Sequence, residues 1–379
     1  MPRVLIYRSR LLPISETFVR QHYDSLTRYE PTFCTLRELD ELDISDTRRV
    51  AMSRGGQAPK LRIGAFKALG IAPGFRRQIA AAKPDLIHAH FAVDAADMLP
   101  VAQALGVPLV VTLHGYDVTY TDRAFRNIGA EGRIYLSKRA RLFREADRFL
   151  PVSRFIEQQA LAAGVPANRM SLHYLGIDLS KFTPNTGERD NVVLYVGRLV
   201  EKKGLNLLVE AMARAGANET GTTLRIIGDG SKREEYLALA NAKLANVDYL
   251  GAQPHPRVIE ELSRARLFCV PSVPSSTGDN EGLPISYMEA SAMALPVVSF
   301  AQGGILEAVK DQETGLLAPT GDVAALADRL ARLLAAPELG VTLGRAGRRH
   351  VEEVFDVRRQ ATRLEEIYDE VIASRSKGR

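Results

Sequence analysis

The chain has 379 residues, of which 46% are hydrophobic and 25% charged, as in ordinary globular proteins, and that length predicts two domains. Its two cysteines, Cys34 and Cys269, lie in apolar runs, which argues against a disulfide framework or a cysteine zinc site and fits a reducing compartment. No apolar run reaches the roughly 18 residues of a membrane span, and charged residues interrupt the N-terminal apolar stretch, so we expect neither a membrane helix nor a signal peptide.

Short apolar runs alternate with helical patterns along the first half of the chain. The helical patterns include "SETFVRQHYDSLTRY" and "AADMLPVAQALG". The strand candidates are "RVLIYR", "PTFCTL", "DLIHAHF", "PLVVTLHG", "RFLPVS" and "MSLHYLG". Runs that are continuously apolar indicate strands covered on both faces, and their alternation with helices is typical of βαβ units in a parallel sheet.

The same pattern restarts after a polar, turn-rich segment, 182–191, which suits a linker. The second set of strand candidates is "VVLYVGRL", "TLRIIGDG", "VDYLG", "RLFCVPS", "LPVVSFA" and "TGLLAPTG". We therefore predict an α/β protein with two Rossmann-like, doubly wound parallel-sheet domains, residues 1–180 and 181–355. Apolar residues spaced by 3, 1 and 3 near the end predict an amphipathic helix within 356–379, which could pack back on the first domain.

One stretch of the second half, "GDNEGLPISYMEASAM", places Glu281 and Glu289 with seven residues between them. Pro284 suits the first turn of a helix, whose N-terminus offers unpaired N–H groups to an anion. A carboxylate on each side of such an anion could accept hydrogen bonds from hydroxyl groups. The pattern fits a phosphate flanked by two sugars, as in a nucleotide sugar, although two glutamates at one spacing usually mark only a solvated helix.

A second stretch, "YVGRLVEKKG", follows the first strand candidate of the second half and so lies where open α/β sheets bind ligands. Gly197 allows a tight turn, and Arg198 and Lys203 could both reach one diphosphate. The stretch is not a Walker loop, and neither it nor "GDGSKR" at Gly228 is a dinucleotide fingerprint. The absence of that fingerprint makes a dinucleotide oxidoreductase the least favoured reading.

Taken in order, these motifs resemble the retaining glycosyltransferases of family 4, which have the GT-B fold. "GRLVEKKG" and "EGLPISYME" are joined by "TLHGYD", "PVSRF", "YLGIDLSKF", "IIGDG", "PSSTGDNEG" and "ETGLLAPTGD" across almost the whole chain. The "ISETFV" and "HAHFA" stretches are similar to a subgroup that builds bacterial exopolysaccharide, the colanic-acid-type transferases. The resemblance implies a glycosyltransferase whose substrate is a nucleotide sugar.

The resemblance also implies roles for individual residues. Glu281 would contact the donor sugar, Glu289 the nucleotide ribose, and His114 the donor sugar from the first domain; without the resemblance, His114 reads as a satisfied strand-end histidine. The remaining donor residues are Arg198 and Lys203 on the diphosphate, with Gly197, Gly228, Gly230, Gly282 and Leu283. The first loop, "RSRLLPIS", lacks the glycines that many members have, and we assign Arg8, Arg10 and Glu16 to the acceptor.

The expected reaction is transfer of a hexose, with retention, from a nucleotide diphosphate sugar to a lipid-linked oligosaccharide or another glycan. On family grounds a UDP-hexose is favoured over GDP-mannose as the donor. No metal or other cofactor is expected because side chains supply the cations. Two alternatives remain open: a UDP-sugar 2-epimerase, which would need no acceptor, and a catalytically silent protein that only binds a sugar nucleotide.

Basic residues gather in the first half of the chain. Residues 1–180 hold 25 basic against 18 acidic residues, a net of +7, and nine basic residues and no acidic one lie between Arg48 and Lys83. A solvated face explains such a run about as well as an anionic partner does. Because apolar residues are interleaved, we favour the anionic inner face of the cytoplasmic membrane over nucleic acid, for which no motif is present. The expected location is the cytoplasm, alone or against that membrane.

Overall fold

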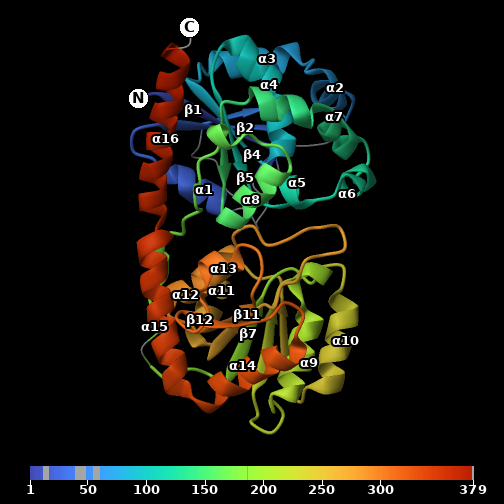
Figure 1. The fold of residues 1–379 in the computed structure, drawn as a ribbon, viewed down its shortest axis with the longest axis vertical. Helices are drawn as coiled ribbons and strands as arrows, with labels where there is room; N and C mark the ends of the chain where they lie inside the picture. The colour runs from blue at the N-terminus through green and yellow to red at the C-terminus, as the bar shows by residue number, and fades with distance from the viewer. Residues whose placement is uncertain (12–16, 39–47, 54–59, 186, 378–379) are drawn as a thin grey trace. The chain divides into compact units, whose positions relative to one another are not determined.

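The computed structural model describes residues 1–11, 17–38, 48–53, 60–185 and 187–377. The chain divides into two compact units (Figure 1). Unit 1 combines Met1–Gly176 with Val357–Arg379, and unit 2 is Ile177–Asp356. The C-terminal segment therefore belongs to the same unit as the N-terminal half.

Unit 1 is built on a parallel sheet of six strands in the order β3-β2-β1-β4-β5-β6. The strands β4 and β5 are buried along their whole length, as continuous apolar runs predict for strands covered on both faces. The strands are β1 (Arg3–Leu11), β2 (Glu30–Glu38), β3 (Arg49–Ala51), β4 (Leu86–His90), β5 (Leu109–Leu113) and β6 (Arg148–Pro151). The helices are α1 (Thr17–Asp24), α2 (Lys60–Leu69), α3 (Pro73–Ala81), α4 (Ala92–Leu105), α5 (Tyr116–Thr119), α6 (Asp122–Asn127), α7 (Ala130–Glu145), α8 (Arg154–Ala162) and α16 (Val357–Lys377).

The C-terminal helix α16 completes the core of unit 1. Its apolar stripe of Leu364, Ile367, Tyr368 and Val371 is buried in one cluster with side chains of β1, α1, β4 and β5. On the same helix, the buried carboxylate of Glu365 accepts hydrogen bonds from the backbone N–H groups of Thr27 and Arg28, each at 2.6 Å. Burial of this stripe and carboxylate explains why the last helix packs on the first unit.

Unit 2 repeats the architecture with a parallel sheet in the order β12-β11-β10-β7-β8-β9. Its strands are β7 (Val192–Val196), β8 (Thr223–Ile227), β9 (Val247–Gly251), β10 (Leu267–Cys269), β11 (Val297–Phe300) and β12 (Gly315–Ala318). Its helices are α9 (Leu205–Arg214), α10 (Arg233–Lys243), α11 (His255–Arg264), α12 (Ile285–Ala292), α13 (Ile305–Ala308), α14 (Val323–Ala335) and α15 (Pro337–Val354), with a 3-10 turn η4 (Glu201–Lys203) before α9.

The predicted fold class is confirmed, and the differences are local. The run "MSLHYLG" forms no strand and contributes only an isolated bridge between Met170 and Phe149. Arg8 and Arg10 were expected in a loop but lie within β1, because β1 continues to pair with β2 through Leu11. Within the described ranges, no helix is long and apolar enough to cross a membrane.

Candidate functional site

The first strand of unit 2, β7, lies between β10 and β8 in the sheet. The connections that follow β7 and β10 therefore leave the sheet in different directions, and such a topological switch point is where open α/β sheets bind ligands. The β7 connection contains Gly197, Arg198 and Lys203, and the β10 connection contains Glu281, Gly282 and Leu283. The fold thus brings most of the predicted donor residues to two facing loops.

Lys203 and Glu281 join these two loops. The Lys203 Nζ lies 2.8 Å from the Glu281 Oε1, and the two side chains are only 14% and 7% exposed. Burial alone would raise the pKa of Glu281, but the charges of Lys203 and Lys202 prevail and lower that pKa to about 2. Burial lowers the pKa of the Lys203 ammonium, against the opposing effect of Glu281. The site therefore holds a desolvated ion pair whose carboxylate stays ionised.

A second ion pair runs beside the first and was not predicted from the sequence. Lys202 Nζ lies 3.0 Å from Asp279 Oδ2, and both side chains are largely buried. The same ammonium lies 3.5 Å from the carbonyl oxygen of Asn280. Adjacent lysines facing two acids separated by one residue were a signal in "EKKG" and "GDNEG" that could have suggested this pairing. Together the two pairs fix the β10 loop against the β7 loop.

Glycines allow the backbones of these loops to approach closely. Gly228 has φ +137°, and a Cβ there would lie 2.0 Å from the carbonyl oxygen of Gly197. At Gly230 a Cβ would meet the carbonyl oxygen of Leu199 at 2.4 Å. The turn at Gly304, after β11, packs in the same way on the carbonyl oxygen of Gly282. These glycines therefore allow the loops that carry Arg198 and Glu281 to pack closely on their neighbouring loops.

Glu289 is in α12, after the Gly-Leu-Pro step that precedes this helix. Its carboxylate is mostly buried and lies 2.8 Å from the Nε2 of His255, the first residue of α11. This hydrogen bond raises the pKa of His255. Sequence analysis missed His255, since only the fold brings residue 255 to residue 289; its place at the start of the helix that follows the strand β9 was the available signal.

Arg198 is exposed beside the buried Lys203–Glu281 pair. Its backbone carbonyl accepts a hydrogen bond from the Tyr195 hydroxyl at 3.1 Å, which anchors the loop. Its guanidinium is near enough to contribute to the lowered pKa of Lys203. The β7 loop thus presents an exposed guanidinium next to a buried ammonium, an arrangement suited to an anion with several oxygens.

In unit 1, His114 follows β5 and is held on several sides. Its Nε2 lies 2.8 Å from the Nδ1 of His90, and its ring packs on that of Phe91 with centroids 4.4 Å apart. Its backbone N–H donates to the buried carboxylate of Asp117 at 3.2 Å. Burial, followed by the charge of Arg8, lowers the pKa of His114 to about 3. The imidazole is therefore neutral at physiological pH.

The three residues assigned to the acceptor differ in their surroundings. Arg8 is 9% exposed, and its Nη1 lies 2.6 Å from the Asp94 Oδ2. Its guanidinium also lies over the Phe91 ring, 4.4 Å from the centroid. Arg10 is exposed, and Glu16 lies outside the described residues. Arg8 is thus already paired, and its contact with Phe91 links it to His114.

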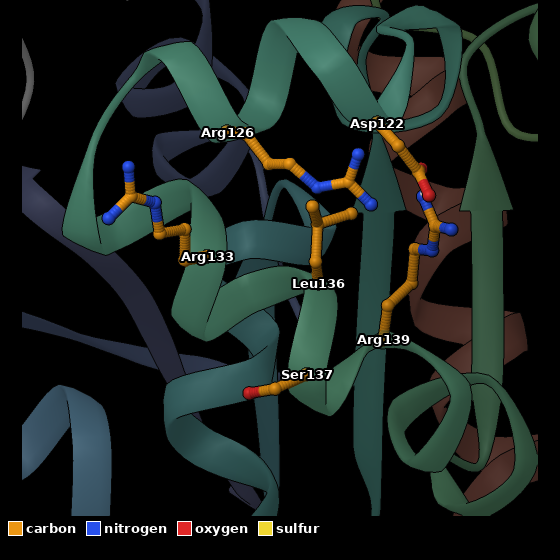
Figure 2. Close-up of a pocket in the computed structure, with 6 residues that line it drawn as sticks. All are labelled: Asp122, Arg126, Arg133, Leu136, Ser137 and Arg139. Carbon is orange, nitrogen blue, oxygen red and sulfur yellow. The ribbon is translucent and has the colours of Figure 1, made fainter.

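A basic hollow of about 380 Å³ lies on α6 and α7 of unit 1 (Figure 2). It is lined by Asp122, Arg126, Arg133, Leu136, Ser137 and Arg139. Figure 2 shows Arg126 extending toward the Asp122–Arg139 pair, whose charged atoms are 2.9 Å apart, and Arg133 turned away from it. Arg126 and Arg133 are exposed and give this hollow a net positive charge.

Metal binding by clustered side chains has no support in the described part of the chain. No group of three or more histidine, cysteine, aspartate or glutamate side chains there is arranged to hold a metal ion.

Comparisons with known proteins agree with the fold and with the motifs. The family model for glycosyl transferases group 1 matches residues 177–350, and that for glycosyltransferase family 4 matches residues 16–181. The amylovoran biosynthesis glycosyltransferase AmsK of Erwinia amylovora is 32% identical over 83% of this chain and 75% of its own. WcaL of Escherichia coli K12, named for colanic acid biosynthesis, is 31% identical over 72% of this chain and 68% of its own.

Solved structures show the same fold at lower identity. Sucrose-phosphate synthase from Thermosynechococcus elongatus superimposes with a TM-score of 0.77 at 24% identity, covering 98% of this chain and 99% of its own. Anabaena HepE in complex with UDP-glucose gives 0.75 at 18% identity, covering 98% and 100%. The chain therefore belongs to glycosyltransferase family 4: it is a glycosyltransferase with the GT-B fold, related to enzymes of exopolysaccharide biosynthesis.

Proposed function

We propose that this glycosyltransferase moves a hexose, with retention, from a UDP-hexose to a lipid-linked oligosaccharide or another glycan of exopolysaccharide biosynthesis. The observation that carries the proposal is the buried Lys203–Glu281 pair at the switch point of unit 2. The names of AmsK and WcaL support the exopolysaccharide acceptor, and the HepE complex with UDP-glucose supports the donor class.

Binding of the donor would separate the Lys203–Glu281 ion pair and give each residue a new partner. Lys203 Nζ and the exposed Arg198 guanidinium bind the diphosphate, which replaces Glu281 as the main counter-charge of Lys203. The released Glu281 carboxylate then accepts hydrogen bonds from the hydroxyl groups of the hexose. Glu289, oriented by His255, accepts them from the ribose. Hydrogen bonds to charged groups are stronger than neutral ones, so both acids hold the sugar hydroxyls firmly.

In the reaction, a hydroxyl oxygen of the acceptor forms a bond to the anomeric carbon as the bond from that carbon to the phosphate oxygen breaks. Both events occur on the same face of the sugar, and the departing phosphate oxygen takes the proton of the acceptor hydroxyl. Arg198 and Lys203 stabilise the negative charge that grows on the nucleoside diphosphate. His114 contributes a neutral hydrogen-bonding group to the donor sugar. No metal ion is required by this scheme.

A membrane-bound acceptor would suit the surface of unit 1. On and just after α2, the side chains of Leu61, Leu69 and Ile71 are 89%, 71% and 56% exposed. Lys60 and Arg62 are exposed on the same helix. Apolar residues that enter the interface and cations that meet anionic headgroups are typical of a helix lying on a membrane. We propose that unit 1 binds the inner face of the cytoplasmic membrane through α2, with the arginine hollow of α6 and α7 adding positive charge.

A transfer assay with radiolabelled sugar nucleotides tests the proposal. The purified chain is incubated with UDP-, GDP- and ADP-hexoses, with and without a lipid-linked oligosaccharide from an exopolysaccharide-producing cell. Label should pass from a UDP-hexose to the lipid fraction only when the acceptor is present. Formation of an isomerised sugar nucleotide without acceptor would identify a 2-epimerase instead. Binding of the donor with neither transfer nor hydrolysis would identify a silent binding protein.

A further inference from the structure

Five of the seven histidines gather in unit 1. A small cavity of about 10 Å³ is lined by four of them, and the fifth, His114, is bonded to one of these four. The five are His22, His88, His90, His114 and His173. The four that line the cavity are His22, His88, His90 and His173, which come from α1, β4 and the segment after α8. Burial lowers the pKa of all five, so the cluster is neutral at physiological pH.

A run of close contacts between side chains connects the interior of this cluster to His114. The His88 Nε2 lies 2.7 Å from the Thr112 hydroxyl, and its Nδ1 lies 2.9 Å from the Tyr23 hydroxyl. The Tyr23 hydroxyl lies 2.6 Å from the His90 Nε2, and the His90 Nδ1 lies 2.8 Å from the His114 Nε2. Tyr23, His90 and His114 are joined by side-chain hydrogen bonds, so their proton positions depend on one another.

The distances indicate which way the protons point. A hydroxyl group donates over shorter distances than a ring N–H does, so the two contacts of 2.6 Å are best explained by phenol donors. These are Tyr368 to the His88 Nδ1 and Tyr23 to the His90 Nε2. With its Nε2 accepting, neutral His90 carries its proton on Nδ1 and donates it to the His114 Nε2. Neutral His114 then carries its own proton on Nδ1.

Phe91 packs on the face of the His114 ring, and His90 is hydrogen-bonded to the edge of that ring. The backbone of Phe91 has φ +68°, a strained value for a bulky residue, and such strain concentrates at functional sites. In this conformation the Phe91 ring packs on His114 at 4.4 Å, and the Arg8 guanidinium also lies over it. The His114 imidazole is thus restrained in position, orientation and tautomer.

We propose that His90 is a positioning residue for His114: it keeps His114 as the neutral tautomer protonated on Nδ1, so that His114 donates a hydrogen bond to an oxygen of the donor sugar. This inference rests on the proposed transfer reaction. A neutral hydrogen-bonding group suits that reaction because glycosyl transfer builds positive charge on the sugar ring, as in glycosidases. A positively charged imidazolium at the same place would oppose that charge.

Nitrogen NMR of the intact chain labelled with ¹⁵N-histidine tests the tautomer without any need for activity. His114→Gln identifies the His114 signals among the seven histidines. Wild-type His114 should be protonated on Nδ1, and either Tyr23→Phe or His90→Phe should shift it to a mixture dominated by the Nε2–H form. Tyr29→Phe is the matched control, because it removes a phenol bonded to Asp369 of α16 and outside the histidine chain. A wild-type Nε2–H tautomer, or one unmoved in both variants, would overturn the proposal.

Kinetics then test whether His90 acts through His114. We expect His90→Phe and Tyr23→Phe to lower kcat for transfer about tenfold with little change in the donor KM, and to have no further effect in a His114→Ala background. Losses that multiply in the double variants would contradict a role through His114. If the wild type transfers no sugar, the proposed function fails, whereas the NMR result still decides the tautomer; the two failures are therefore distinguishable.

Discussion

Lowering the pH from 7.5 to 5.5 should destabilise unit 1 through its five buried histidines. Burial lowers their pKa values, to about 3 in His114 and about 4 in His173, whereas the ordinary value in the unfolded chain is 6.5. Between these values the unfolded chain binds protons that the folded chain does not, so stability falls as the pH falls. A histidine that stays neutral in the folded chain accounts for a loss of stability on the order of 1 kcal/mol over this range, so the five together lose several kcal/mol.

Two buried carboxyls of unit 1 act in the opposite direction. Burial raises the pKa of Asp97 to about 7, although Lys67 opposes it, and raises that of Asp117 to about 6, although backbone hydrogen bonds oppose it. The folded chain therefore takes up protons at these groups as the pH falls, which returns a few kcal/mol and leaves a smaller net loss. In unit 2 the hydrogen bond that His255 donates to Glu289 raises the pKa of His255, so acid favours the folded form there.

Hydrogen exchange of the intact chain, corrected for the intrinsic rate at each pH, separates the two units. Peptides from β4 and β5 should lose protection at pH 5.5, while peptides from β7 and β11 should keep theirs. In His22→Leu, which removes one titrating group, the loss should shrink by on the order of 1 kcal/mol. Equal protection of unit 1 at both pH values, or an equal loss in unit 2, would refute the reasoning.

Four further predictions concern the site and the membrane. Lys203→Ala should lower kcat on the order of a hundredfold. It should also destabilise the fold by about 3 kcal/mol in urea titrations, because Glu281 becomes a buried unpaired charge. Replacing both Lys203 and Glu281 by alanine should recover stability but not activity. Glu289→Gln should raise the donor KM about tenfold, with kcat nearly unchanged, because a charged acceptor is lost. Added chelator should leave the transfer rate unchanged. Leu61→Asp with Leu69→Asp should abolish sedimentation with anionic vesicles and leave soluble-donor binding intact; equal binding of the wild type to neutral vesicles would exclude the electrostatic part.

The sequence was sufficient to predict the two parallel sheets. Each βαβ step spans ten or more residues in which apolar strand runs alternate with a helical pattern. All six strand candidates of the second half form strands. In the first half, "MSLHYLG" was wrong, and the strand β3 was missed because Arg49–Ala51 is short and only its last residue is buried. Apolar pattern alone does not reveal a three-residue edge strand.

The loops of the candidate site could also be located, but the partners within them could not. No local pattern connects His255 to Glu289, or Asp94 to Arg8, because each pair meets only when the sheet has formed. The basic run between Arg48 and Lys83 shows the same limit. The Lys67 side chain is mostly buried and paired with Glu131, so this residue does not contribute an exposed cation.

Calorimetric titration of UDP, GDP and ADP into the wild type and single variants tests the central claim, that the β7 and β10 loops of unit 2 bind a nucleoside diphosphate. UDP should bind the wild type, and Lys203→Ala and Arg198→Ala should each weaken it at least tenfold, since one charge-assisted hydrogen bond is worth about 1.5–3 kcal/mol. Lys232→Ala, which removes an exposed lysine paired with Glu235 beside α10, should bind UDP as the wild type does. Equal affinity in all four proteins, or no binding of any of the three nucleotides, would contradict the account.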